Sequence, residues 1–551
     1  MSATRPKYMC VPAREISMTS ASKTTDQKSS AKKSPTNKTS AKKKKNTKKA
    51  ARTIECYNPA TSKIIAEIPA TAVEEIPAKV TAAKQAFQSW RRLSVEERCR
   101  HMLEARDHLL DHREEILDLL VAETGKAIID AQAELLTVFE TFRYYTSNAA
   151  EFLADQPLNL HLLKNKRVKV QYPPIGLVVN ISPWNFPIDL SLTPAIPALI
   201  AGNAVMIKPS EHTSLAVIRA IEVMNESGLP EGLLQVMPGF GDVGAALCDE
   251  ADAITFTGSV ATGRKVAKAA AENLVPCTLE LGGKDPAIVL DDADIERAAN
   301  GIVWGSFFNS GQVCMSVERV YVHEAVYDQF VERVVELTRD LRQGVPWDYT
   351  IDIGAMIDPD QKHIIEKHIK DAVDKGARIL TGGKRRDTDE GDFFEPTVLV
   401  DVDHSMKIMK EETFGPVMPI MKVRSGFEAV QLANDSEFGL NSSVWTGDVR
   451  RGRDLARQIE SGQVCINDVI ASYLALEAPY GGVKHSGIGR RKSKNELHKF
   501  TQSKTVLEDI FNLKKEPFWF PYNAGVGKAV DKVFGVLYRR GISKKITDLF
   551  S

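Results

Sequence analysis

The stretch GLVVNISPWNFPIDLSLTPAIPALIAGNAVMIKPSE, residues 176–211, determines the fold class that the sequence predicts. It contains the longest apolar segment of the chain, residues 188–207. Asp189, Pro194 and Asn203 interrupt that segment, so it is a poor candidate for a membrane span. We predict instead a buried helix and turn that lead into a short buried strand.

The alternation of strands and helices continues along the chain. Its apolar runs are short and continuous, which is typical of parallel strands covered on both faces. A first set comprises Gly176–Ile181, Ala204–Ile207, Leu233–Met237, Ala253–Thr257, Thr278–Leu281 and Ala287–Leu290. A second set includes Val320–Val322, Arg378–Leu380, Val417–Val423 and Val464–Asn467. We therefore predict an α/β fold with two doubly wound parallel sheets.

Two further segments have recognisable patterns. Residues 73–122 carry apolar side chains near helical spacing, which predicts helices. Leu158–Tyr172 contains two polar–apolar runs around Lys164-Asn165-Lys166, which predicts a β-hairpin. Such a hairpin would expose a sheet edge, and natural proteins usually pair or cover edges. We expect it to protrude and to join subunits in a homodimer or homotetramer.

Charge is distributed unevenly along the chain, although its formal net charge is zero. Residues 1–52 carry fifteen Lys or Arg and two acidic residues, which leaves 57 basic and 70 acidic residues in 53–551. An acidic globular part argues against a specific nucleic-acid site. The lysine-rich segment 1–52 cannot bury enough apolar surface to fold. We predict a disordered basic tail, which is either solvated or in contact with a polyanion.

Seven cysteines are present, and no two have C-x-x-C spacing. Neither a disulfide framework nor a zinc site is expected from this odd, dispersed set in a large chain. The first residues also lack the apolar run of a secretory signal. We expect a cytoplasmic protein without a metal.

Three chemically distinctive residues lie at the boundaries of predicted elements. Cys314 ends the segment FNSGQVC, Asn185 lies in the segment WNFP, and Glu280 lies in the segment TLELGGK. A lone cysteine is more often a small buried apolar residue than a nucleophile. However, the carboxyl ends of strands are where α/β sheets bind ligands. A thiol, an amide donor and a carboxylate at such boundaries could therefore meet in one crevice.

These segments resemble those of the aldehyde dehydrogenase superfamily, in the same order, from about residue 53 to 512. Further matching segments are Lys208-Pro209-Ser210-Glu211, Phe256-Thr257-Gly258-Ser259 with Gly263, and Glu411-Glu412-Thr413-Phe414-Gly415-Pro416. The resemblance implies a dinucleotide-binding domain at 53–281 with the hairpin inserted at about 156–173, a catalytic domain at 282–483, and a bridging or oligomerisation segment at 484–512. These lie between the tail, 1–52, and a C-terminal extension, 513–551.

The resemblance also implies a reaction, the NAD(P)-dependent oxidation of an aldehyde to a carboxylic acid. The Cys314 thiolate would add to the aldehyde carbon, and the Asn185 amide and the Cys314 backbone N–H would stabilise the oxyanion. Loss of hydride would leave a thioester, which a water activated by Glu280 would hydrolyse. Family branches that pass the acyl group to coenzyme A generally lack a carboxylate at the position of Glu280, so we expect a free acid as product.

The cofactor half departs from the usual dinucleotide fingerprint, because Gly258-Ser259-x-x-x-Gly263 replaces a G-x-G-x-x-G after the first strand. Gly258 allows close backbone approach, and a helix beginning near Ser259 offers N–H groups to a pyrophosphate. The resemblance places Lys208 and Glu211 at the adenosine ribose and Glu412 at the nicotinamide ribose. The other expected cofactor residues are Ser182, Trp184 and Phe414. Because the Glu211 carboxylate would repel a 2′-phosphate, we expect NAD rather than NADP.

Several strings resemble a bacterial succinate-semialdehyde dehydrogenase branch of the family. They are GQVCMSVER (311–319), GLNSSVW (439–445) and SGIGRR (486–491). Better-known members of that branch hold the far carboxylate of the substrate with an Arg eight positions after the asparagine, where this chain has Thr193. Some superfamily members carry Glu at the position of Arg491. An anionic tail must therefore be recognised elsewhere, and Arg319 is a candidate although its position suggests a structural ion pair. We expect succinate semialdehyde as substrate, with a neutral medium-chain or aromatic aldehyde as the alternative.

The C-terminal extension has a pattern of its own. The aromatic segment Pro517–Tyr522 precedes an apolar stripe at helical spacing that runs from Val526 to Leu537. Lysines and arginines surround the stripe, so we predict a basic amphipathic helix. It either packs on its own protein or a sister subunit, or lies on an anionic membrane surface.

Two rival function classes remain at this stage. A non-catalytic binding protein of the same fold would be expected to lack Cys314, Glu280 or Asn185, and all three are present. A cysteine hydrolase would need a histidine beside the thiol. His323 is nine residues from Cys314, and we expect it at the edge of a loop.

Overall fold

The computed structural model describes residues 52–346, 348–386, 391–516, 518–542 and 545. These residues form two units, the first comprising 52–154 and 172–502 and the second comprising 155–171 and 503–545, each without its undescribed positions. The predicted basic tail, 1–52, lies outside the described residues except for Arg52.

The first predicted set of strands forms most of a six-stranded sheet in the first unit. Its five parallel strands have the order β9-β8-β5-β6-β7. They are β5 (Leu177–Ile181), β6 (Ala204–Lys208), β7 (Leu234–Val236), β8 (Ala253–Thr257) and β9 (Cys277–Glu280). β19 (Gly487–Ile488) adds an antiparallel edge strand beside β9. The stretch 176–211 therefore forms a strand, a helix and a parallel strand, as predicted.

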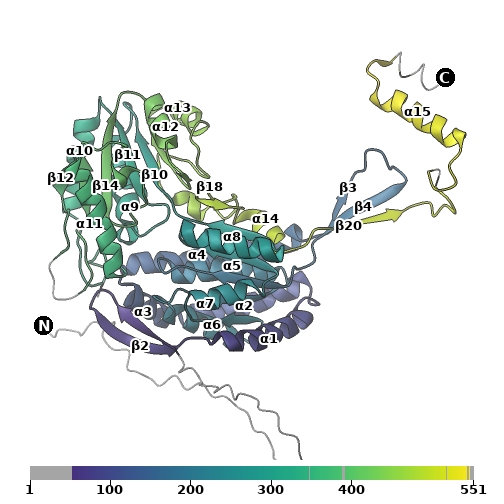
Figure 1. Cartoon of the computed structure of the whole chain (residues 1–551), viewed down its shortest axis with the longest axis horizontal. Coiled ribbons are helices and arrows are strands. Elements are labelled where there is room, and N and C mark those ends of the chain that lie inside the picture. Colours follow the sequence, from purple (N-terminus) through teal and green to yellow (C-terminus); the bar gives the residue numbers. More distant parts are fainter. Residues whose placement is uncertain (1–51, 347, 387–390, 517, 543–544, 546–551) are drawn as a thin grey trace, which may run out of the picture. The chain divides into compact units, whose positions relative to one another are not determined.

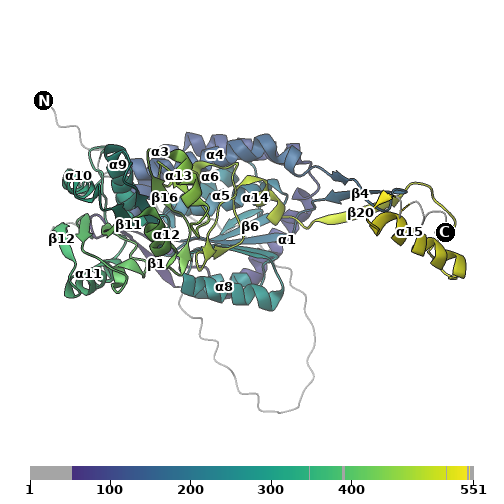
Figure 2. The same cartoon turned by 90° about the horizontal axis from the view of Figure 1, so that it is seen from above.

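Helices cover both faces of this sheet. On one face lie α5 (Pro187–Ile200) and α6 (Leu215–Glu226), and on the other lie α7 (Gly241–Cys248) and α8 (Val260–Asn273) (Figure 2). All residues of α5 are buried, which explains why its sequence is apolar on every side. The helices change faces where the strand order reverses, between β5 and β8. In such sheets the carboxyl ends at this point form a ligand-binding crevice.

The chain before this sheet is largely helical. The predicted helical region 73–122 is confirmed, and the helices extend to residue 152. The elements are β1 (Thr53–Asn58), β2 (Lys63–Pro69), η2 (Val73–Glu75), α1 (Ile76–Trp90), α2 (Val95–Asp111), α3 (Arg113–Thr124) and α4 (Ile128–Phe152). α4 packs along α5 and brings its own side chains close to the end of β5.

The second sheet has seven strands in the order β12-β13-β14-β11-β10-β16-β17, all parallel except β12. They are β10 (Asp285–Val289), β11 (Val317–His323), β12 (Arg378–Thr381), β13 (Thr397–Val400), β14 (Val417–Val423), β16 (Ser443–Trp445) and β17 (Cys465–Ile466). The run Ala287–Leu290 was grouped with the first set, and this was wrong. Only four residues separate β9 from β10, which is too short for a crossover to a parallel neighbour in the same sheet.

Both faces of the second sheet are buried. Ala287 and Val289 of β10 pack in one core cluster, whereas Ile288 between them packs in another. α9 (Ile295–Phe307) and α10 (Tyr327–Arg339) contribute to the first cluster, and α11 (Pro359–Asp374) and α12 (Gly426–Asn434) to the second (Figure 1). The α/β fold with two doubly wound sheets is thus confirmed. The remaining elements of this unit are η3 (Phe308–Gly311), η4 (Lys407–Met409), β15 (Phe438–Gly439), α13 (Val449–Ala456), η5 (Ala471–Leu474), β18 (Val483–Lys484) and α14 (Ser493–Lys499).

The second unit contains a hairpin whose second strand is as predicted, but its first strand lies earlier than predicted, because residues 159–165 form no strand. β3 (Gln156–Leu158) and β4 (Lys166–Gln171) are antiparallel, and β20 (Lys504–Asp509) pairs with β4 to complete a three-stranded sheet (Figure 2). The predicted amphipathic helix is α15 (Ala524–Tyr538), and none of its side chains is buried. In the part of the chain that the structure describes, no helix is both long and apolar enough to span a membrane.

Candidate active site

Two cavities of the first unit meet at Cys314. The first has a volume of about 300 Å³ and is lined by residues that follow β5, β8 and β9. The second has a volume of about 160 Å³ and is lined largely by apolar side chains. Cys314 and Thr257 line both cavities. A molecule in either cavity can therefore approach the same sulfur atom.

The three residues predicted for the chemistry converge at this junction. Asn185 lines the first cavity and Glu280 lines the second, on either side of Cys314. The Asn185 Nδ2 donates a hydrogen bond to the Gln312 carbonyl oxygen at 3.0 Å, two residues before the thiol. An amide group has a second N–H, which remains available to a ligand. The Cys314 backbone N–H makes no hydrogen bond within the described residues.

The loop that carries Cys314 has an unusual backbone. Asn309 and Ser310 have φ values of 51° and 57°, and Gly311 follows with 71°. Three successive left-handed residues are costly unless their surroundings hold them. The Asn309 N–H donates to the Asp130 carboxylate of α4 at 3.0 Å. At Gly311, a Cβ would lie only 2.3 Å from the Gly415 carbonyl oxygen. The backbone of this loop is therefore fixed from two sides.

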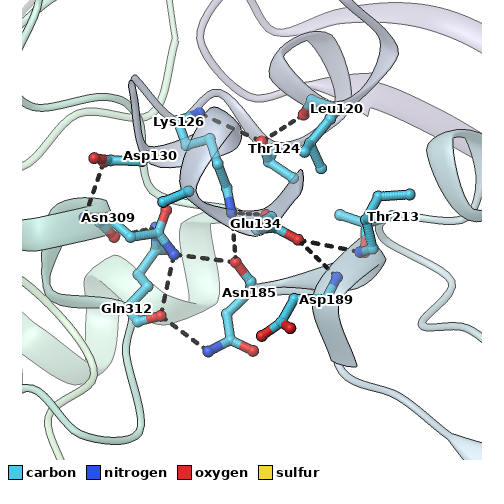
Figure 3. A network of polar contacts seen from close by, with 12 residues as sticks. Leu120, Thr124, Lys126, Asp130, Glu134, Asn185, Asp189, Thr213, Asn309 and Gln312 are labelled. Carbon is cyan, nitrogen blue, oxygen red and sulfur yellow. Dashed lines mark hydrogen bonds and ion pairs between the residues drawn. The ribbon is translucent and has the colours of Figure 1, made fainter. Parts of the chain in front are cut away.

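A buried polar network holds the segment that bears Asn185 (Figure 3). Lys126 donates to the Glu134 carboxylate and, at 2.7 Å, to the Asn185 carbonyl oxygen. The other Glu134 oxygen accepts from the N–H groups of Ile188 and Asp189 at the start of α5. Charged groups are rarely buried unless paired in this way. Lys126 and Glu134 thus position the amide donor without touching the thiol.

Sequence reasoning missed this network. The only signal was the placement of two acids, Asp130 and Glu134, one helical turn apart among the apolar residues of α4. Both are buried. A carboxylate on the apolar face of a helix requires a buried partner, but the sequence does not say which residue supplies it.

The thiol of Cys314 is neutral in this environment. Burial raises its pKa above the usual range for cysteine, and the carboxylates of Asp285, Glu412 and Glu280 add to the shift. A hydrogen bond with Tyr480 acts in the opposite direction. The sulfur must therefore lose its proton before it can act as a nucleophile, since the thiolate is the reactive form.

Glu280 is a carboxylic acid poised near neutral pH. Burial raises its pKa to about 8, while the positive charges of Arg491 and Lys499 oppose the shift. Neither of its side-chain oxygens has a hydrogen-bond partner among the described residues. Gly481 allows this placement, because a Cβ there would lie 2.8 Å from the Glu280 Oε1. A group with such a pKa can exchange protons with water at physiological pH.

Five of the expected cofactor residues line the first cavity. They are Trp184, Gly258, Ser259, Glu412 and Phe414. Ser259 precedes α8, and its Oγ accepts a hydrogen bond from the Thr262 N–H at 3.3 Å. The Glu412 carboxylate accepts from the Gly283 N–H at 2.9 Å, and a Cβ at Gly282 would lie 2.4 Å from its other oxygen. A glycine-lined cradle, a helix N-terminus and a carboxylate fit the phosphates and a ribose of a dinucleotide.

The other four expected cofactor residues do not line this cavity. Lys208 and Glu211 form an ion pair of 3.0 Å at the end of β6. Burial alone would raise the pKa of Glu211, but the Lys208 charge and hydrogen bonds keep it below its ordinary value. The Ser182 hydroxyl is buried against the Ser191 hydroxyl at 2.7 Å. At Gly263, a Cβ would lie 2.5 Å from the Leu281 side chain, so this glycine lets α8 pack closely.

The second cavity has an apolar wall and a few polar groups. Phe186, Trp304, Phe308 and Ile470 are among its apolar residues. Its polar groups are the three acids Glu134, Asp189 and Glu280, the guanidinium of Arg491, and hydroxyl groups such as that of Tyr473. The Asp189 carboxylate accepts a 2.5 Å hydrogen bond from the Tyr473 hydroxyl.

Arg319 and His323 do not line either cavity. Arg319 is buried and donates to the carbonyl oxygens of Lys284 and Ala433 at 2.8 and 2.9 Å. It therefore does not bind the anionic tail of a substrate in the second cavity. His323 lies at the end of β11. The described residues contain no group of three or more His, Cys, Asp or Glu that could hold a metal ion.

Comparisons with known proteins identify the family that this chain resembles. Residues 46–506 match the model of the "Aldehyde dehydrogenase family". A Mycobacterium ulcerans protein named "Putative succinate-semialdehyde dehydrogenase [NADP(+)] 2" is 38% identical over 456 residues, which are 82% of this chain and 88% of that protein. A "4,4'-diapolycopene aldehyde oxidase" from Methylomonas sp is 37% identical over 86% of this chain and 89% of its own. Betaine aldehyde dehydrogenase from Staphylococcus aureus, solved with NAD+, is similar in structure with a TM-score of 0.81 at 33% identity, covering 85% of this chain and 94% of its own.

Proposed function

The chain belongs to the aldehyde dehydrogenase family and is an NAD(P)+-dependent aldehyde dehydrogenase, and on this premise we propose that Cys314, Asn185 and Glu280 carry its reaction. The observation that supports this assignment most strongly is the position of Cys314, whose side chain lines both cavities. A sulfur between a cofactor cavity and a substrate cavity can hold an aldehyde carbon where its hydride is transferred.

The reaction begins when the Cys314 thiol gives its proton to water and the sulfur bonds to the aldehyde carbon, whose C=O π electrons move to the oxygen. The carbonyl oxygen becomes an oxyanion, which the free N–H of the Asn185 amide and the Cys314 backbone N–H stabilise. Glu412 and the Gly258–Ser259 turn would hold a nicotinamide dinucleotide, which would accept the hydride that the adduct loses as its carbonyl re-forms to give the thioester. Glu280 then takes a proton from water, the hydroxide attacks the thioester, and the C–S bond breaks to release a carboxylate.

The test is the formation of reduced nicotinamide over a panel of aldehydes. Cys314→Ala should remove activity with every aldehyde because no thioester can form. Cys277→Ala is the matched control, since that thiol is also half-buried but lines neither cavity. Equal activity of wild type and Cys314→Ala would contradict the assignment.

For the substrate we propose succinate semialdehyde. The name of the Mycobacterium ulcerans relative and the arginine in the second cavity support it. A neutral apolar aldehyde is the second candidate. The largely apolar wall of the cavity favours it, and so does the name of the Methylomonas relative.

For the cofactor we propose NAD rather than NADP. Glu211 is ionised, and its carboxylate would repel a 2′-phosphate placed beside it. The ion pair with Lys208 reduces this repulsion, so we expect a preference rather than exclusion. Because a relative is named for NADP(+), the preference for NAD over NADP must be measured.

We propose that the enzyme is a cytoplasmic homodimer or homotetramer. The six described cysteines are all free thiols, which fits a reducing compartment. The edge strand β3 is only three residues long, and Leu158 and Leu162 beside it are exposed. Exposed apolar side chains at a sheet edge favour pairing with another subunit.

We also propose that the C-terminal extension makes peripheral contact with anionic membranes. α15 has no buried side chain, and Val530, Phe534 and Leu537 on its apolar stripe are exposed. Trp519 and Tyr522, which precede the helix, are exposed as well. Residues 513–551 carry eight Lys or Arg and three acidic residues. A basic helix with an apolar face and interfacial aromatic residues is typical of proteins that lie on such a surface.

A further inference from the structure

The second cavity contains a single cation, and its position bears on substrate choice. Among the described residues that line the cavity, Arg491 is the only lysine or arginine. Its side chain is 2% exposed, and its Nη2 donates to the Thr193 Oγ1 at 2.7 Å. Thr193 occupies the position from which related enzymes extend an arginine. The guanidinium thus lies against the Thr193 hydroxyl of α5, although the backbone of Arg491 belongs to the segment after β19.

From this contact we infer that Arg491 binds the distal carboxylate of the substrate and is the residue that selects a carboxylate-tailed aldehyde. The inference rests on the proposed function, because it names the group that recognises the substrate of that same site. Arg491 would then recognise the anionic tail of the substrate in a chain that has threonine at position 193.

The backbone of Arg491 is fixed beside the reacting sulfur. Arg491 and Tyr480 exchange two backbone hydrogen bonds, of 2.7 and 2.8 Å. The Tyr480 side chain hydrogen-bonds the Cys314 sulfur, and all three residues line the second cavity. The two paired segments therefore carry the Tyr480 side chain, which contacts the thiol, and the Arg491 guanidinium. A substrate with its aldehyde at Cys314 lies in the cavity that Arg491 lines.

The guanidinium of Arg491 can still donate a hydrogen bond to a ligand. Its Nε has no hydrogen-bond partner among the described residues, and the nearest carboxylate oxygen that pairs with it, Glu496 Oε1, is 4.0 Å away. That Glu496 oxygen is already 2.9 Å from the Lys499 ammonium. The Thr193 hydroxyl donates to the Asp189 carbonyl oxygen at 2.7 Å and so accepts from Arg491. A buried cation with an unsatisfied N–H is costly, and a carboxylate ligand would satisfy it.

The acids that share the cavity do not fully cancel this charge. Burial raises the pKa of Glu280 to about 8, so its carboxyl group is mostly neutral at pH 7. Burial also raises the pKa of Asp189, although the hydrogen bond from the Tyr473 hydroxyl and the charges of Lys492 and Arg491 act in the opposite direction. Asp189 therefore offsets part of the Arg491 charge, and its Oδ2 is already bonded to Tyr473. The carboxylate of Glu134 is paired with Lys126. The cavity can therefore accept a negative group at Arg491.

The test compares two aldehydes of equal chain length, succinate semialdehyde and butanal, which lacks the carboxylate. In Arg491→Gln we expect kcat/KM for succinate semialdehyde to fall roughly 10- to 100-fold, the worth of a buried charge-assisted hydrogen bond. For butanal it should change less than about 3-fold, because that substrate makes no such bond. The matched control is Arg490→Gln, which removes a neighbouring guanidinium bonded only to backbone carbonyl oxygens of Gly482 and Gly489. It should leave the ratio of the two kcat/KM values unchanged.

A double variant that moves the arginine to another position distinguishes loss of substrate recognition from a folding defect. Thr193→Arg combined with Arg491→Thr returns the guanidinium to α5 and should restore at least about tenfold of the lost preference. An equal loss for both aldehydes in Arg491→Gln, or no change for either, would overturn the inference. So would wild-type enzyme that oxidises butanal but not succinate semialdehyde, although the proposed catalytic residues would then still stand. Absence of nicotinamide reduction with every aldehyde would instead overturn the proposed function itself.

Discussion

At the scale of single residues, two groups in the active site have proton affinities far from their ordinary values. The Cys314 thiol is held neutral by burial and by three neighbouring carboxylates, and Glu280 is held near neutrality by burial. The same low-dielectric surroundings strengthen the hydrogen bonds that stabilise an oxyanion. Desolvation thus disfavours the charged forms of both Cys314 and Glu280, so each group must lose a proton before it acts.

The raised pKa of Glu280 predicts how turnover depends on pH. A general base works only when it is deprotonated, and burial places this pKa at about 8. The steady-state rate should therefore rise from pH 6, reach half its maximum near pH 8 and level off about one pH unit above that. The measurement is kcat across this range with saturating aldehyde and cofactor. A profile that is already flat between pH 6 and 7 would show that Glu280 is not the base that limits turnover.

Glu211 is the residue on which the cofactor preference depends. Replacing it with Gln removes the negative charge but keeps the size of the side chain. The kcat/KM for NADP relative to that for NAD should rise about tenfold, because a 2′-phosphate no longer meets a carboxylate. Glu222→Gln is a suitable control, since that acid also lies near a basic side chain, on α6. If the ratio of kcat/KM for NADP to that for NAD is unchanged in Glu211→Gln, then Glu211 does not determine the cofactor preference.

At the scale of elements, the loop between α9 and β11 depends on one glycine. Gly311→Ala would place a methyl group 2.3 Å from the Gly415 carbonyl oxygen, and the residue must also keep a φ of 71°. We expect soluble protein with activity lowered at least about 100-fold, because a displacement of about 1 Å at a reacting group has such an effect. The assay is steady-state nicotinamide reduction together with a melting temperature.

Gly228→Ala is the control that distinguishes the effect of a positive φ from the effect of a steric clash. Gly228 also has a positive φ, 97°, but a Cβ there meets nothing within 4 Å. This variant should lose some stability and keep its activity. If Gly311→Ala and Gly228→Ala behave alike, the close contact with Gly415 does not determine the position of Cys314.

Much of the element structure could be predicted because local patterns determine it. β5, β8 and β14 were bounded within a residue, since each is a continuous apolar run that both faces of a sheet bury. β13 and β16 were missed, although β12 and β17, which are no longer, were predicted. The residues proposed for the chemistry were identified through their segments, and the structure places them at the two cavities. In contrast, the contact between Thr193 and Arg491 joins residues 298 positions apart, and no local pattern reports such a contact.

At the scale of the whole molecule, charge and apolar surface are separated along the chain. The extension 513–551 is basic, whereas residues 53–551 as a whole are acidic. The apolar stripe of α15 is exposed. A surface of this kind requires a covering, and an anionic membrane supplies both apolar contact and opposite charge.

A truncation after residue 512 tests the membrane contact. The full chain should sediment with vesicles that contain anionic lipid, and the truncated chain should remain in solution. The attraction should weaken in 0.5 M salt and with zwitterionic vesicles, because it is partly electrostatic. The oligomeric state of both forms, measured by sedimentation, is the control. Loss of oligomers without any vesicle binding by the full chain would assign the helix to a sister subunit instead.

The central claim is that a thioester forms on Cys314 and that Glu280 is needed to hydrolyse it. The most direct measurement mixes the Glu280→Gln enzyme with aldehyde and NAD+ and determines the mass of the peptide that contains Cys314. We predict a rapid burst of about one equivalent of reduced nicotinamide per active site, slow turnover afterwards, and the mass of one acyl group on Cys314. Undiminished steady turnover with an unmodified Cys314, or an acyl group on a different cysteine, would contradict it.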